Sequence, residues 1–236
     1  MRTLLQTAAI LMAPTLAAVP AVAETGPVVV ELYTSQGCSS CPPADAMLSE
    51  LVETEGVIPL ALHVDYWDYI GWADEFANPA HTRRQQNYAR AAGATTIYTP
   101  QFVVGGKDTV VGAKAMTLAD QIRAHSMVEM PVSVSMGREE NQIAISASWE
   151  AEDSSAEPMV VQLVRVASEE TVDIKRGENA GHSLSYSNIV QSWDVVAEWD
   201  GAAPLSLNAE VAEADMYVVI VQAGTNGPIL GAAKLY

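Results

Sequence analysis

The feature that most constrains the fold of this chain is a pair of cysteines placed directly after an apolar stretch. Residues 28–34 are a run of strand-forming residues, and Cys38 and Cys41 follow after a short turn. Pro42 and Pro43 come next and suit the first turn of a helix. The chain contains no other cysteine. Because N–H groups at a helix N-terminus carry partial positive charge and stabilise a thiolate, this placement predicts a reactive thiol pair.

The spacing of the two cysteines predicts a division of roles between them. Cys38, at the end of the loop, is expected to be the exposed nucleophile, and Cys41, one helical turn further in, the partly buried resolving thiol. Two other interpretations stay open, an inert structural disulfide and half of a zinc site. A zinc site usually needs a second Cys-x-x-Cys or a close pair of histidines, and the sequence has neither.

The first 23 residues have the pattern of an export signal. Arg2 is followed by an uncharged apolar run from Leu4 to Val19 and by Ala-Val-Ala at 21–23, so cleavage is expected before Glu24. The apolar run is short for a membrane span of about 20 residues. The protein is therefore expected to be secreted, most simply into the periplasm, with no membrane insertion after cleavage.

The composition excludes some classes of partner and leaves room for two domains. The formal net charge of −17 argues against binding to nucleic acid or to anionic membranes. A chain of this length has enough apolar residues to build one large or two modest cores without stapling disulfides. The two cysteines are therefore expected to serve chemistry, and no cofactor is expected.

Hydrophobic periodicity divides the remaining chain near residue 130. From Val28 to Met127 it predicts the order β-α-β-α-β-β-α. After Met130-Pro131 the period changes to two, and strands are expected at 132–136, 143–149, 159–166, 171–174, 184–196, 205–207, 217–223 and 229–235. This pattern predicts an α/β domain over 24–129 and an antiparallel β-sandwich-like domain over 130–236. A short junction without a Gly/Ser-rich stretch predicts that the two pack together.

The first of these domains resembles the thioredoxin fold. Its element order is the minimal order of that fold, and a strand followed by Cys-x-x-Cys at the start of a helix is the layout of thioredoxin-like redox proteins. Such proteins place a cis proline at the start of the third strand, facing the cysteines, and Thr99-Pro100 is similar to that segment. An ordinary trans proline at the start of a strand is the alternative.

The chain as a whole is similar to the secreted proteins of the domain-of-unknown-function 1223 family. The residues that carry the resemblance lie at 31–45, 63–72, 98–101 and 177–179. The resemblance implies a thioredoxin-like fold and a redox-type site, and it implies no particular substrate.

The thioredoxin-like resemblance also implies roles for residues outside the cysteine pair. Glu31 interrupts an apolar strand where thioredoxins carry a buried acid, so it is the candidate proton acceptor; a strand-end carboxylate that reaches solvent is the alternative. Thr99, Pro100 and Gln101 would hold extended polypeptide beside the reactive sulfur. Helical periodicity, independently of the resemblance, places Asp45 on the polar face of the helix that follows Cys41.

The connection after the second strand holds a third of the aromatic residues of the chain. Tyr66, Trp67 and Trp72 would form a lid or a substrate-binding wall over the cysteines, or would fill the seam between the domains. His63, at the end of the preceding strand, is interpreted as a hydrogen-bonded histidine. The alternative is a soft-metal site, such as one for copper, made by Cys38, Cys41 and His63.

The remaining polar candidates have weaker patterns. Glu178 and Asn179 are expected to hold a turn or the domain interface. His81, His125 and His182 are expected at the surface. The sequence as a whole therefore predicts an exported thiol–disulfide oxidoreductase acting on protein or small-molecule thiols and disulfides. A metal-binding module and a non-enzymatic interaction protein are the alternatives.

Overall fold

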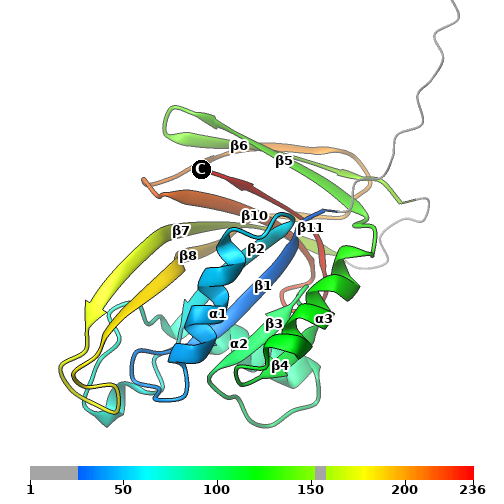
Figure 1. Ribbon diagram of the computed structural model, residues 1–236. Coiled ribbons are helices and arrows are strands. Elements are labelled where there is room, and N and C mark those ends of the chain that lie inside the picture. The colour runs from blue at the N-terminus through cyan, green and yellow to red at the C-terminus, as the bar shows by residue number, and fades with distance from the viewer. Residues whose placement is uncertain (1–25, 152–157) are drawn as a thin grey trace, which may run out of the picture.

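The computed structural model describes residues 26–151 and 158–236 (Figure 1). Its N-terminal half contains β1 (Val28–Thr34), α1 (Pro42–Val52), β2 (Val57–His63), the 3-10 helix η1 (Asp68–Ile70), α2 (Pro79–Ala91), β3 (Gln101–Val104), β4 (Asp108–Val111) and α3 (Ala115–Ser126). Apart from η1, this is the order that the sequence predicts. The expected signal peptide, residues 1–23, lies outside the described residues.

The C-terminal half is built from strands. They are β5 (Val132–Glu139), β6 (Gln142–Trp149), β7 (Met159–Asp173), β8 (Ser183–Trp199), β9 (Leu205–Glu210), β10 (Met216–Ala223) and β11 (Ile229–Leu235). The expectation of separate strands at 159–166 and 171–174 is wrong, because β7 runs through both. The exposed residues Glu169 and Glu170 pair with Ser187 and Tyr186 of β8, so the strand continues across them.

One large sheet runs through both halves of the chain. Its strand order is β11-β10-β7-β8-β2-β1-β3-β4. β1 and β2 are parallel, β1 and β3 antiparallel, and β8 joins β2 in parallel through Ala61 and Ile189. The large sheet therefore contains strands from both sides of residue 130, the point in the sequence at which the periodicity changes. The division of the chain into two domains stays a prediction.

A second sheet of three strands, in the order β5-β6-β9, covers part of the large one (Figure 1). Apolar side chains from both sheets form a shared core, which includes Ile143, Ile145, Val161, Tyr217 and Val219. The C-terminal half thus has two β layers, but one layer belongs to the same sheet as β1 and β2. The architecture is mixed α/β, with a large central sheet and a smaller additional one.

The central strands are apolar on both faces because helices cover both sides. Val30 and Leu32 of β1 pack with Leu48 of α1 on one face, in a cluster that also holds residues of α3. Val29 and Tyr33 of β1 face the opposite cluster, which includes Tyr88 of α2. Strands buried on both faces have near-continuous apolar runs, and residues 28–34 are such a run, interrupted by Glu31. Among the described residues, none of the helices has the length and apolarity needed to cross a membrane.

Candidate active site at the Cys38–Cys41 disulfide

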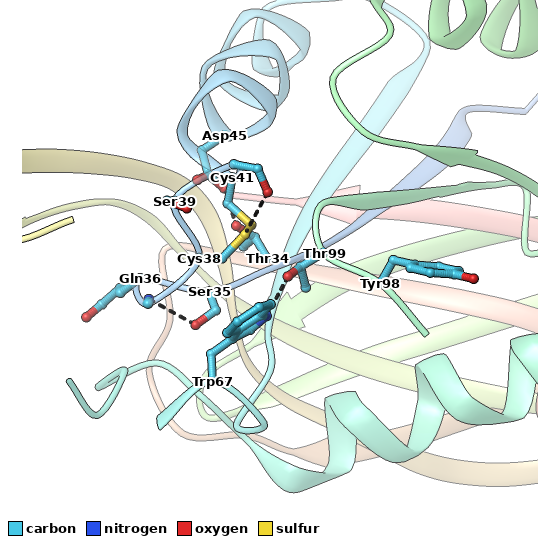
Figure 2. Close-up of a disulfide and its surroundings, with 12 residues drawn as sticks. Thr34, Ser35, Gln36, Cys38, Ser39, Cys41, Asp45, Trp67, Tyr98 and Thr99 are labelled. Carbon is cyan, nitrogen blue, oxygen red and sulfur yellow. Dashed lines mark hydrogen bonds between the residues drawn. A yellow bond between two sulfur atoms is a disulfide. The ribbon is translucent and has the colours of Figure 1, made fainter. Parts of the chain in front are cut away.

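Cys38 and Cys41 form a disulfide where β1 passes into α1 (Figure 2). Cys41 is the N-cap residue of α1, and Pro42 follows in the first turn. The loop before the helix is folded on itself, since the Cys38 N–H donates to the Ser35 carbonyl and the Cys41 N–H to the Cys38 carbonyl, both at 3.1 Å. The sequence predicted this placement at the helix N-terminus, where a thiolate is stabilised.

Both cysteines are buried, with exposed fractions of 1% for Cys38 and 0% for Cys41. The expectation that Cys38 is exposed is therefore wrong for the disulfide form. The segment that contains Trp67 and η1 packs on Gly37, the residue before Cys38. A Cβ atom on Gly37 would lie 3.3 Å from Cβ of Trp67 and 3.3 Å from Cδ1 of Ile70.

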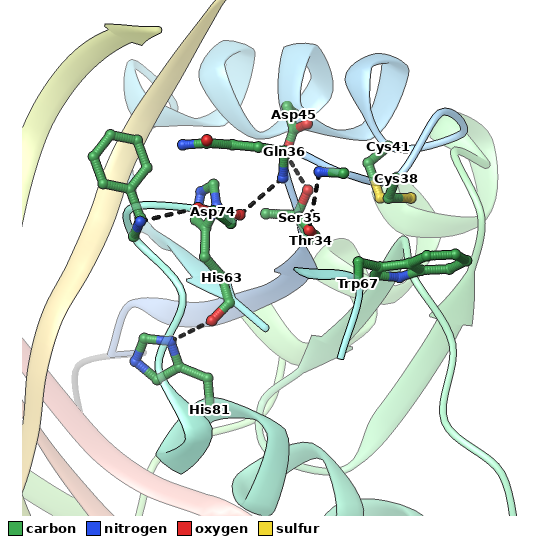
Figure 3. Close-up of polar contacts among 12 residues, drawn as sticks. Thr34, Ser35, Gln36, Cys38, Cys41, Asp45, His63, Trp67, Asp74 and His81 are labelled. Carbon is green, nitrogen blue, oxygen red and sulfur yellow. Dashed lines mark hydrogen bonds and ion pairs between the residues drawn. A yellow bond between two sulfur atoms is a disulfide. The ribbon is translucent and has the colours of Figure 1, made fainter. Parts of the chain in front are cut away.

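Trp67 links the covering segment to the loop before β3. Its indole lies next to the disulfide in both close-up views (Figures 2 and 3). Nε1 of Trp67 donates a 2.6 Å hydrogen bond to Oγ1 of Thr99. The peptide bond between Thr99 and Pro100 is cis, which confirms that expectation. Trp67, Thr99 and the disulfide, which lie far apart in the sequence, are thus brought together.

Two further predicted substrate-binding residues are held by one buried side chain, Gln85. Its Oε1 accepts from the Tyr66 hydroxyl at 3.2 Å, and its Nε2 donates to Oε1 of Gln101 at 2.7 Å. Burial raises the pKa of Tyr66 to about 12. The side chains of Tyr66 and Gln101 are therefore ordered within the protein, and their role in binding substrate stays a prediction.

Gln36, in the loop before the disulfide, is held through both its side chain and its backbone. Nε1 of Trp72 donates to Oε1 of Gln36 at 2.7 Å. The backbone N–H of Gln36 donates to Oδ2 of Asp74 at 2.8 Å. The predicted residue Trp72 therefore supports the loop that carries the disulfide.

His63 is buried and paired with Asp74, as Figure 3 shows. Nδ1 of His63 lies 2.7 Å from Oδ2 of Asp74, and the histidine ring makes edge contacts with Phe76 and Tyr186. This arrangement agrees with the interpretation of His63 as a hydrogen-bonded histidine.

The soft-metal alternative finds no geometric support. In residues 26–151 and 158–236, no three His, Cys, Asp or Glu side chains lie close enough together to hold a metal ion. Cys38, Cys41 and His63 are thus not brought together as a ligand set.

His81 is buried, and the expectation that it lies at the surface is wrong. Its Nδ1 is 2.9 Å from the carbonyl oxygen of His63, so this nitrogen carries the proton and donates. Burial lowers the pKa of His81 to about 4, so the ring is neutral at pH 7. The first turn of α2 therefore packs against the end of β2.

Glu31 is buried in a polar network on the α2 side of the sheet. Its two oxygens accept hydrogen bonds from Arg84 at 2.7 and 2.9 Å, from Tyr33 at 2.9 Å and from Tyr88 at 2.7 Å. The guanidinium of Arg84 also lies 3.8 Å from the ring centre of Trp193. Both oxygens of the Glu31 carboxylate are thus hydrogen-bonded within this network. The role of Glu31 as proton acceptor for the cysteines stays a prediction.

Asp45 is buried beside the disulfide, although the sequence placed it on the polar face of α1. Its Oδ1 accepts a 2.7 Å hydrogen bond from Oγ1 of Thr34, the last residue of β1. Burial raises the pKa of the Asp45 carboxyl to about 6. The signal in the sequence is its position four residues after Cys41, because residues i and i+4 share a helix face.

The C-terminal half contributes directly to the disulfide loop through Asn179. Nδ2 of Asn179 donates to the backbone carbonyls of Gln36 at 2.9 Å and of Cys38 at 3.0 Å. The neighbouring Glu178 accepts a long 3.4 Å contact from the N–H of Ser39. Glu178 and Asn179, which the sequence analysis expected to hold a turn or the domain interface, thus contact the disulfide loop of the candidate site.

Fold and site together define the chain as a mixed α/β protein with a Cys-x-x-Cys disulfide at the start of the helix after its first strand. The chain belongs to the family described as "Protein of unknown function (DUF1223)", whose model matches residues 29–222. This match confirms the family resemblance that the sequence motifs suggested. No curated protein matches the chain.

The solved structures that match include two that are similar over most of the chain. The crystal structure of protein AGR_C_4864 from Agrobacterium tumefaciens has 32% sequence identity and a TM-score of 0.75, and the match covers 91% of this chain and 95% of that one. HBP35 of Porphyromonas gingivalis has 14% identity and a TM-score of 0.62, over 90% of this chain and 75% of that one. At 14% identity the second similarity shows the fold alone.

Proposed function

We propose that this protein is an exported thiol–disulfide oxidoreductase with a thioredoxin-like N-terminal domain. The observation that carries the proposal is the Cys38–Cys41 disulfide at the N-terminus of α1, directly after the buried strand β1. The order of β1 to α3 supports the thioredoxin-like assignment. The apolar stretch at residues 4–19 supports export to the periplasm.

The exchange reaction uses the two sulfurs in sequence. A substrate thiolate attacks Cys38, the Cys38–Cys41 bond breaks, and Cys41 leaves with the electron pair. The second thiol of the substrate then attacks its own sulfur in the mixed disulfide and releases Cys38. The substrate is oxidised to a disulfide, the protein is reduced to a dithiol, and two protons pass from the substrate thiols to the two cysteines. In the direction just described, the protein oxidises a substrate dithiol. In the reverse direction, the reduced protein reduces a substrate disulfide.

Access to Cys38 requires movement of the covering segment. Trp67 lies beside the disulfide and is fastened to Thr99 by one hydrogen bond. Displacement of this indole would expose Sγ of Cys38 in the space between Trp67 and the loop at residues 99–101. Protein or small-molecule thiols would bind there, and the C-terminal half, residues 130–236, would act as a domain that holds the loop through Asn179.

Insulin reduction with dithiothreitol as electron donor tests the proposal on the chain from residue 24 onward. The wild-type protein is expected to accelerate insulin precipitation, and Cys38→Ser to abolish the acceleration. Cys41→Ser is expected to trap mixed disulfides through Cys38. Equal rates for wild type and Cys38→Ser would contradict the proposal.

The burial of both cysteines favours a second candidate, a structural disulfide. The reduction potential of the Cys38–Cys41 pair separates the two. A value near or above about −270 mV, as in thioredoxin, supports exchange, and a value below about −300 mV identifies a structural bond.

A further inference from the structure

The carboxylate of Glu178 lies at the protein surface beside the disulfide loop. Its Oε2 is 3.4 Å from the backbone nitrogen of Ser39, and Glu178, Ser39 and Ser40 are all exposed. Because the Ser39 nitrogen is bonded to the carbonyl carbon of Cys38, bond lengths place this oxygen within about 9 Å of Sγ of Cys38. That distance is shorter than the screening length of about 10 Å in 0.1 M salt. The charge of Glu178 therefore acts on a reagent that reaches the sulfur.

The position of Glu178 is fixed by the turn between β7 and β8. Backbone hydrogen bonds close this turn over residues 174–182. The next residue, Asn179, is 6% exposed, and its Nδ2 donates a 3.0 Å hydrogen bond to the carbonyl of Cys38. The carboxylate is thus carried by a backbone segment that is itself fastened to the disulfide loop.

No cation is paired with the Glu178 carboxylate within residues 26–151 and 158–236. The ion pairs of this part of the chain join His63 to Asp74, Arg84 to Glu31, Arg123 to Asp120 and His125 to Asp108. Lys175 and Arg176 precede Glu178 in the same turn and are exposed, but neither forms an ion pair with it. The turn therefore presents an unpaired negative charge next to the disulfide.

We propose that Glu178 makes the protein discriminate between thiol substrates by their charge. The attacking species in the exchange reaction is a thiolate, which is itself negative, and each further anionic group near its sulfur adds to the repulsion by Glu178. Thiols with cationic groups nearby, such as a cysteine among basic residues of a polypeptide, are favoured over thiols with carboxylate or sulfonate groups. This inference rests on the proposed thiol–disulfide exchange and names the substrate class for it.

The distance between carboxylate and sulfur sets the size of the effect. At about 9 Å in water, one unit of charge on the reagent changes the rate of reaction about twofold. The interaction is screened by salt and disappears in 1 M salt, where the screening length is about 3 Å. A purely hydrogen-bonding role of Glu178 toward Ser39 would show no dependence on the charge of the thiol.

Reduction of the disulfide by three simple thiols tests the inference on the oxidised chain from residue 24 onward. The thiols are mercaptoethanesulfonate, mercaptoethanol and cysteamine, whose thiolates carry two, one and no net negative charge. A first thiolate attacks Cys38 and releases the Cys41 thiolate. A second thiolate attacks the reagent sulfur of the mixed disulfide and releases Cys38, so two thiols become one disulfide and the protein gains their two electrons and two protons.

The rate is measured by acid quench, alkylation and mass spectrometry, at thiol concentrations where it rises in proportion to concentration. Glu178→Gln keeps an oxygen that can accept from the N–H of Ser39 and removes only the charge. For each thiol, the ratio of the variant rate to the wild-type rate cancels the intrinsic reactivity of the reagent.

At low salt, Glu178→Gln is expected to accelerate reduction about fourfold with mercaptoethanesulfonate and about twofold with mercaptoethanol, and to leave the rate with cysteamine unchanged. In about 1 M NaCl the three ratios should converge to one. Equal ratios for the three thiols at low salt would overturn the proposal.

Glu210→Gln is the matched control, because it removes the same charge from an exposed residue of β9. β9 belongs to the three-stranded sheet, and this sheet and the loop before α1 lie at opposite ends of the view in Figure 1. All three ratios should stay near one in this variant. The same charge dependence in Glu210→Gln as in Glu178→Gln would assign the effect to the net charge of the protein and would also overturn the proposal.

The test separates failure of this inference from failure of the proposed function. It follows a single reduction of the disulfide, so an inactive protein in the insulin assay with charge-dependent ratios would count against the proposed function alone. Equal ratios in an active protein would count against the role of Glu178 alone. A disulfide that none of the three thiols opens would contradict both.

Discussion

The side-chain amide of Asn179 donates a 3.0 Å hydrogen bond to the backbone carbonyl of Cys38, 141 residues earlier in the chain. The same amide group also donates to the carbonyl of Gln36. A residue between β7 and β8 therefore fixes the backbone on which the disulfide is built.

Substitution of Asn179 by alanine should loosen the disulfide loop. Two buried carbonyls lose their donor, and the expected loss of stability is about 1–3 kcal/mol, measured by urea unfolding. Glu178→Gln is the matched control, because Glu178 is exposed and its contact with Ser39 is long. It should change stability by less than about 0.5 kcal/mol. Equal effects of the two substitutions would contradict the anchoring role of Asn179.

Trp67→Phe should make the disulfide easier to reduce. Phenylalanine keeps an aromatic ring but cannot donate to Oγ1 of Thr99, so the covering segment loses its fastening. A loss of roughly 1 kcal/mol corresponds to about a fivefold rise in the rate of reduction by dithiothreitol, if opening limits that rate. Tyr69→Phe is the control, since Tyr69 is 80% exposed and only its hydroxyl is removed. A rate for Trp67→Phe equal to that of wild type would show that the indole does not control access.

Removal of Arg84 alone should be far more harmful than removal of the whole ion pair with Glu31. Arg84→Met leaves the buried Glu31 carboxylate without its cation, at a cost of about 3–5 kcal/mol. The double variant Glu31→Gln/Arg84→Met should recover a large part of that loss. Arg123→Met, which breaks the exposed pair with Asp120, is the control and should cost less than about 1 kcal/mol. Additive losses in the double variant would contradict the coupling.

His81 should make the protein less stable in mild acid. Its pKa is about 4 in the folded protein and 6.5 when the imidazole is fully solvated, so between these values the unfolded chain binds more protons. Stability is therefore lost as pH falls from about 6.5 to 4, by about 3 kcal/mol in total. Urea unfolding of His81→Asn should show a smaller loss than wild type over this range, while the exposed His182→Asn should behave as wild type. The raised pKa of Asp45 has the opposite effect on stability, because this carboxyl binds its proton more tightly in the folded protein. The contribution of His81 is therefore taken from the difference between the variant and the wild type.

The local elements of the N-terminal half followed from the sequence alone. The apolar run at residues 28–34, the prolines after Cys41 and the period change near residue 130 depend on neighbours within a few positions. They predicted the order from β1 to α3, the placement of the cysteines at a helix start and the strand-rich C-terminal half. Such features are set by backbone preference and by which face of an element is apolar.

Burial and distant contacts were decided by the tertiary structure. The parallel pairing of β2 with β8 brings Tyr186 to His63, and the turn after β7 brings Asn179 to Cys38. Asp45 is polar, and a helical period therefore assigns it to the solvent side. It is buried because β8 packs against α1 and because Thr34, at the end of β1, donates a hydrogen bond to its carboxylate. No local pattern contains the partners of His63 and Cys38 in these two contacts, because Tyr186 and Asn179 lie more than a hundred residues further along the chain.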